Sequence, residues 1–188
     1  MTPEENGSEP PPLLRPAPLV KGEAIGVVAP SYAPREGWLH RGVKALERAG
    51  YGVILDSEIG TMRRFERMED ERRAENFMGM WLDPRVKAVI GGTGGYGAAR
   101  MIPHLEPEVF RRNPKAFVGY SDITALHLWL MRRLDYVSFT GQPWMTSSRV
   151  RATQRWRRCS RPSRRLDRPH GWGATSRAPC AQGARSAD

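Results

Sequence analysis

Short apolar segments alternate with segments of helical periodicity through most of the chain, and this alternation constrains the fold more than any other feature. Residues 24–29 are apolar without polar residues at alternate positions, as in strands covered on both faces of a parallel sheet. We expect strands at 24–29, 52–55, 86–90, 115–118 and 136–139, with helices over 39–49, 74–82 and 123–134 and a short one ending at 101. This order is typical of an open, mostly parallel α/β sheet with helices on both faces, of the flavodoxin or Rossmann type.

The two ends of the chain lack this pattern, which predicts one α/β domain at residues 21–146. Residues 1–20 are rich in proline and glutamate and are expected to be disordered. Residues 147–188 are expected to form a disordered, arginine-rich tail, since residues 151–188 contain ten arginines, no lysine and two acidic residues. We favour an out-of-frame origin for this tail because its basicity is all arginine and the apolar pattern stops abruptly. A genuine basic tail that contacts nucleic acid non-specifically is the other interpretation.

Composition excludes several classes of function. The net charge of +10 is concentrated in the tail, so the predicted domain lacks the basic face of a specific nucleic-acid binder. Both cysteines, Cys159 and Cys180, lie in the tail and match no metal-ligand or redox spacing. The acidic start is unlike a signal peptide, and no apolar run reaches the ~18 residues that a membrane span needs. We expect a cytoplasmic protein without metal, cofactor, membrane or specific nucleic-acid partner.

The segment Gly119-Tyr-Ser-Asp122 joins an apolar strand to an amphipathic helix. A serine at such a corner projects from a sharp turn, and the free N–H groups of the helix start can stabilise the oxyanion that forms when its hydroxyl attacks a carbonyl. Ser121 is therefore a candidate nucleophile. The alternative is that Ser121 or Asp122 only caps the helix.

The glycine-rich segment 91–97 matches neither the dinucleotide fingerprint nor a P-loop. Its backbone amides could hold a phosphate or give a second oxyanion donor beside Ser121, or the segment could be a tight turn without a ligand. No histidine is an evident base for Ser121. His127, six residues further along the same helix, points about 120° away from the hydroxyl, and the other three are His40, His104 and His170.

Four segments together resemble the LD-carboxypeptidases, also called muramoyltetrapeptide carboxypeptidases, and the related microcin-C self-immunity peptidases. The resemblance covers about residues 21–145. The segments are GEAIGVVAPS at 22–31, DPRVKAVI at 83–90, GGYGAAR at 94–100 and NPKAFVGYSDITALH at 113–127.

The resemblance implies a cytoplasmic serine hydrolase that cuts the terminal L,D-peptide bond of a murein tetrapeptide during cell-wall recycling. Ser121 would be the nucleophile. The oxyanion hole would consist of the backbone N–H of Asp122 and one from the Gly94-Gly95 turn. A muropeptide substrate and a homodimer are implied, but no metal or cofactor.

The sequence departs from the family pattern in three places. Thr93 stands where members often have arginine, and the Gly-Pro segment of the family reads Gly141-Gln142-Pro143. Members are longer, and their second domain supplies the Glu and His of a Ser-His-Glu triad, which the arginine-rich tail replaces here. We therefore expect a truncated chain that is inactive alone. The alternative is a non-catalytic module that binds a small anion or a protein partner.

Overall fold

The computed structural model describes residues 12–60 and 67–141, which contain a five-stranded sheet whose described strands are all parallel. The strand order is β2-β1-β3-β4-β5. The strands are β1 (Ala24–Val28), β2 (Gly52–Leu55), β3 (Val86–Gly91), β4 (Ala116–Gly119) and β5 (Phe139–Thr140). This is the flavodoxin-like order, in which the chain reverses its direction across the sheet between β1 and β3. The predicted fold class is confirmed.

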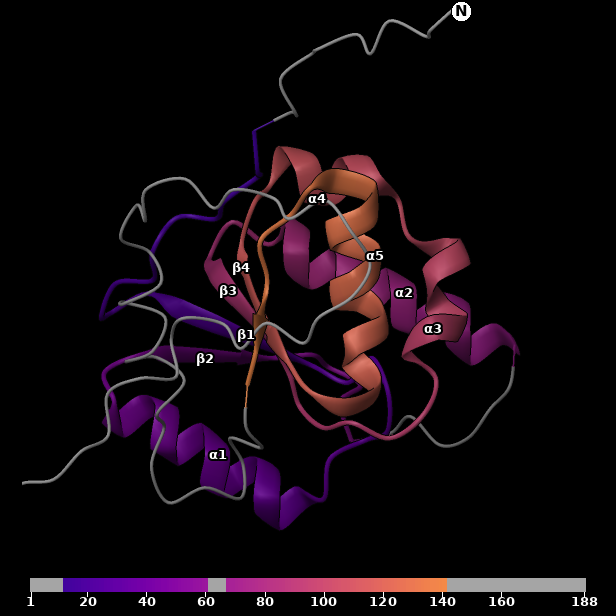
Figure 1. Ribbon diagram of the computed structural model, residues 1–188. Helices are drawn as coiled ribbons and strands as arrows, with labels where there is room; N and C mark the ends of the chain where they lie inside the picture. Colours follow the sequence, from indigo (N-terminus) through magenta and orange to yellow (C-terminus); the bar gives the residue numbers. More distant parts are fainter. Residues whose placement is uncertain (1–11, 61–66, 142–188) are drawn as a thin grey trace, which may run out of the picture.

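Helices cover both faces of the sheet (Figure 1). One face is covered by α1 (Glu36–Arg48), and the other by α2 (Arg67–Leu82), α4 (Pro107–Arg112) and α5 (Thr124–Leu134). Two short elements, α3 (Ala98–Met101) and η1 (Ile102–His104), connect β3 to α4, and η2 (Ser121–Ile123) precedes α5.

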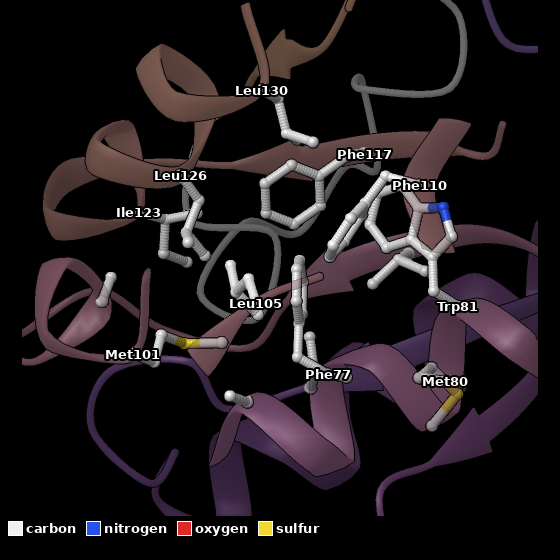
Figure 2. Close-up of a cluster of buried hydrophobic side chains, with 14 of the residues drawn as sticks. Phe77, Met80, Trp81, Met101, Leu105, Phe110, Phe117, Ile123, Leu126 and Leu130 are labelled. Carbon is white, nitrogen blue, oxygen red and sulfur yellow. The ribbon is translucent and has the colours of Figure 1, made fainter. Parts of the chain in front are cut away.

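The larger apolar core lies between the sheet and α2, α4 and α5, and aromatic side chains fill its centre (Figure 2). Phe77 and Trp81 of α2 contact Phe110 of α4 and Phe117 of β4, with ring centroids 4.8–5.7 Å apart. The Trp81 indole N–H donates to the carbonyl of Asn113 at 2.6 Å. Close packing of this kind fixes β4, and β4 leads directly into the candidate motif.

Several predicted elements differ in their bounds by one to three residues, and α2 differs by more at its start; the differences at the fifth strand and at α2 are the most informative. The fifth strand was expected at 136–139 but is only Phe139–Thr140. Tyr136 instead forms an isolated parallel bridge with Leu14, and its phenol bonds both the N–H and the carbonyl of Lys115 at 2.6 Å. The buried phenol needs these partners, and they hold Tyr136 out of the ladder. Helix α2 begins at Arg67 rather than near residue 74.

Part of the N-terminal segment also departs from its prediction. Residues 12–20 were expected to be disordered, yet Leu14 exchanges backbone hydrogen bonds with Asp135 and Val137. Leu19 is buried in the core beside α1. These residues are ordered because the burial of Leu19 and the bridge from Leu14 to Tyr136 offset the loss of chain entropy. Residues 1–11 and the predicted tail at 147–188 lie outside the described residues.

Candidate active site

Ser121 lies at the corner between β4 and the η2–α5 helical segment, and its side chain is exposed. Its φ angle is +58°, in the left-handed region that residues other than glycine and asparagine rarely adopt. A serine in a sharp, strained strand-to-helix turn is the geometry of a nucleophile elbow. The turn is anchored in the larger core, since Ile123 is fully buried there (Figure 2).

Gly119 permits this corner to close. A Cβ at this position would lie 2.3 Å from the Cγ2 of Ile123 and 3.2 Å from the Nε2 of His127. Any larger residue would therefore push α5 away from the end of β4. The sequence predicted a sharp turn in this segment, and the close contact between Gly119 and Ile123 shows why a glycine precedes it.

The glycine-rich loop after β3 meets the serine directly. A Cβ at Gly94 would lie 2.7 Å from the Cβ of Ser121 and 3.0 Å from its Oγ, so the Gly94 backbone contacts the serine side chain. The loop after β1 joins them, because a Cβ at Gly95 would lie 2.5 Å from the ring of Tyr32. Loops after β1, β3 and β4 thus converge at the carboxyl edge of the sheet, beside its switch point, where open α/β sheets bind ligands.

Neither Ser121 nor Asp122 is the N-cap of its own helical segment, because the N-cap residue is Tyr120 for η2 and Ile123 for α5. Neither η2 nor α5 has a side-chain hydrogen bond at its N-terminal cap. The Asp122 carboxylate turns instead to the neighbouring loops, where its Oδ2 accepts from the Oγ of Ser31 at 2.7 Å and from the N–H of Ala98 at 2.9 Å. The N–H of Ile123 donates to the carbonyl of Tyr120 at 3.2 Å. The N–H of Asp122 has no such partner among the backbone hydrogen bonds of the described residues, and a free amide at a helix start can bind an anion.

A buried charged group lies beneath the glycine-rich loop, and sequence reasoning missed it. Asp70 and Arg73 of α2 form an ion pair and are 4% and 5% exposed. Arg100 also bonds Asp70, while a nitrogen of Arg73 reaches the carbonyl of Ser31 at 3.4 Å. A Cβ at Gly97 would lie 2.6 Å from the Arg73 guanidinium, so this side chain supports the loop from below. Acidic and basic residues on one helix, such as Asp70 and Arg73, normally lie on a solvent-exposed face. The sequence therefore gave no indication that this pair is buried.

The contacts that the structure gives for His127 and His104 do not involve Ser121. The ring of His127 is buried against Phe117, and its Nδ1 lies 2.8 Å from the Oγ of Ser138. Burial lowers the pKa of His127, which keeps the ring neutral. His40 is exposed on α1, and His104 lies 3.9 Å from Glu71. The geometry therefore assigns no base to the serine within residues 12–60 and 67–141.

Thr93, which replaces the expected arginine, lies next to the motif. Its Oγ1 is 3.3 Å from the phenol oxygen of Tyr120. This contact ties the residue before Ser121 to the glycine-rich loop through neutral groups. Residues 142 and 143 of the other departure lie outside the described part of the chain.

Two features are absent from the described ranges, 12–60 and 67–141. Within them no group of three or more His, Cys, Asp or Glu side chains is arranged to hold a metal ion. None of the helices found there combines the length and apolar character required to cross a bilayer.

Comparison with known proteins gives one consistent result. Residues 25–141 match the sequence profile of the family described as LD-carboxypeptidase N-terminal domain. The "Probable murein peptide carboxypeptidase" of Bacillus subtilis is 33% identical over 127 residues, covering 68% of this chain and 40% of the relative. The chain thus spans about two fifths of the length of the curated relatives that it matches.

Solved structures agree with the sequence comparison. An MccF-like protein from Bacillus anthracis superposes with a TM-score of 0.65 at 29% identity, covering 71% of this chain and 41% of the other. The microcin C7 self-immunity protein MccF, in complex with aspartyl sulfamoyl adenosine, superposes with a TM-score of 0.62 at 27% identity, covering 68% of this chain and 38% of the other. The range that matches the family profile, residues 25–141, includes the loops that carry Ser121 and Gly94.

Proposed function

The chain belongs to the LD-carboxypeptidase family through its N-terminal domain, and from this premise we propose that it carries the nucleophile half of a serine peptidase site. The observation that carries the proposal is the exposed Ser121, held at φ +58° against the backbone of Gly94. The substrate is a murein tetrapeptide, and the bond cut is its terminal L,D-peptide bond.

In the proposed reaction the Oγ of Ser121 attacks the scissile carbonyl carbon and forms a tetrahedral intermediate. The backbone N–H of Asp122 and one N–H of the Gly94-Gly95 turn donate to its oxyanion, which preorganised amides stabilise without further reorganisation. The C–N bond then breaks, and D-alanine leaves as the protonated amine. Water hydrolyses the acyl-serine ester and regenerates the hydroxyl.

We propose that the base that takes the proton from Ser121 is the His of a triad, oriented by a Glu, and that neither residue comes from this chain. Removal of a triad partner typically costs ~10⁴-fold or more in turnover. We therefore propose that the 188-residue chain alone releases no measurable D-alanine. The reaction belongs in the cytoplasm, where muropeptides are recycled, and a homodimer is the proposed assembly.

The decisive experiment restores the missing part of the site. Residues 1–141 are fused to the C-terminal part of the Bacillus subtilis relative, and D-alanine release from a murein tetrapeptide is followed by mass spectrometry. We expect release from the fusion, none from the 188-residue chain, and none from the fusion that carries Ser121→Ala. The exposed Ser57 supplies the control, since Ser57→Ala should leave release unchanged.

Each result discriminates. Release that persists in Ser121→Ala would refute the nucleophile, and a folded fusion that releases nothing would refute the substrate. Ser121-dependent release by the 188-residue chain itself would refute the claim that its base lies elsewhere.

A second substrate class is favoured by one observation, the MccF complex with aspartyl sulfamoyl adenosine. The same loops in this chain would then accept an aminoacyl nucleotide, either as a substrate or, in a non-catalytic module, as a ligand. Thermal shifts of the full chain with the muropeptide, with phosphate and with the sulfamoyl adenosine separate these cases. A shift with the nucleotide alone would favour the second class.

A further inference from the structure

Asp122 occupies a junction between three segments that are distant in the sequence. Its Oδ2 accepts from the Oγ of Ser31, 91 residues away in the loop after β1, and from the N–H of Ala98 at the start of α3. The carboxylate is half-buried, and Ser31 is 2% exposed. Hydrogen bonds to an ionised acceptor are roughly twice as strong as neutral ones, so this junction is a strong local constraint.

The loop that the carboxylate holds would otherwise be mobile. Gly95 and Gly97 have φ angles of +133° and +122°, and glycines lose more chain entropy on ordering than any other residue. The hydrogen bond to Ala98 fixes the end of this loop. The guanidinium of Arg73 supports Gly97 from beneath and also reaches the carbonyl of Ser31.

The fixed loop is the one that meets the nucleophile. Gly94 lies against the Cβ and Oγ of Ser121, and Ser121 precedes Asp122 directly in the chain. The side chain of Asp122 therefore pulls the glycine-rich loop toward the same turn from which the serine projects. A shift of about 1 Å in such a pair can cost about 10²-fold in turnover.

We propose that Asp122 is a positioning residue, whose carboxylate holds the Gly94–Gly97 loop against Ser121 by accepting from Ser31 and Ala98. The proposal rests on the proposed function, in which that loop supplies an oxyanion donor. It adds to the backbone N–H of Asp122 a separate task for its side chain. The Ser31–Asp122–Ala98 junction aligns the donors before a substrate arrives.

Amide hydrogen exchange, measured by NMR on the 188-residue chain, tests this proposal residue by residue. Asp122→Ala removes the acceptor, whereas Asp122→Asn keeps an oxygen that can accept from both donors. We expect exchange at residues 94–98 to rise about tenfold or more in Asp122→Ala and to stay near the original rate in Asp122→Asn. Amides of β3 and β4 report on global unfolding and should remain protected. Glu75→Gln, at an exposed site on α2, controls for the loss of one negative charge.

The outcomes separate cleanly. Exchange at 94–98 that is the same in Asp122→Ala as in Glu75→Gln would overturn the proposal, and so would an Asp122→Asn variant as mobile as Asp122→Ala. If Asp122→Ala does not fold, Ser31→Ala decides, with faster loop exchange expected and unchanged exchange refuting the junction. The measurement needs no substrate, so failure of the proposed hydrolysis would leave this result standing, and the reverse also holds.

Discussion

Replacing Gly94 by alanine tests the contact between the glycine-rich loop and the serine most directly. The new Cβ would lie 2.7 Å from the Cβ of Ser121, whereas non-bonded carbons prefer about 3.5–4.0 Å. The loop and the elbow must then separate by about 1 Å. Overpacking of this kind costs about 1–3 kcal/mol of unfolding free energy, which corresponds to a fall in Tm of roughly 3–10 °C for a domain of this size.

The control for this substitution is Gly79→Ala. Gly79 lies within α2, and a Cβ there would meet nothing within 4 Å. Alanine should therefore stabilise the helix by about 0.5–1 kcal/mol. The two variants make the same chemical change with opposite expected signs.

Urea unfolding, followed by tryptophan fluorescence, measures the stability of both variants. D-alanine release by the fusion measures the cost of the displaced loop, which we expect to be about 10²-fold for a shift near 1 Å. A Gly94→Ala chain that unfolds like Gly79→Ala, with unchanged release in the fusion, would refute the reasoning. It would mean that the loop does not lie against Ser121 in solution.

Three further predictions concern stability, each measured by urea unfolding. Burial lowers the pKa of His127 below 6.5, so just below this pH the unfolded chain binds a proton at the ring and the folded chain does not. The free energy of unfolding should therefore decrease as the pH drops below about 6.5, and His127→Gln should reduce this decrease. Burial lowers the pKa of Lys115 from 10.5 to about 8, so the free energy of unfolding should increase as the pH rises from about 8 to 10. Above about pH 10 the buried Tyr136 phenol, whose pKa is raised, should oppose this increase. Lys115→Met should abolish the increase. Trp81→Phe leaves a carbonyl without its donor and should cost about 1–3 kcal/mol, whereas Trp38→Phe, on the surface of α1, should change little.

The fold was predictable because it depends on periodicity. Continuous apolar runs, such as 24–28 and 88–91, indicate buried parallel strands whatever their neighbours are. The fifth strand was misplaced because its limit depends on a tertiary contact, the bond from the Tyr136 phenol to the backbone of Lys115, which no local pattern encodes.

The candidate site was predictable only in part. The strand-to-helix corner at Ser121 follows from local sequence, and the resemblance indicated its neighbour Gly94. The contacts that hold the corner could not be inferred, because Ser31 and Asp122 are 91 residues apart. Arg73 was not among the residues that the sequence singled out, yet it is 5% exposed and contacts the loop at Gly97. Its burial depends on pairing with Asp70, which only the folded arrangement reveals.

At position 121, thermal stability and catalytic activity favour different residues, because the backbone of Ser121 is left-handed. An L-residue in that conformation costs roughly 1–2 kcal/mol, and glycine would relieve this cost. A library ranked only by resistance to melting would consequently enrich Ser121→Gly and discard the hydroxyl. Efforts to stabilise this domain should therefore keep Ser121 and place stabilising substitutions on distant helix surfaces, such as that of Gly79.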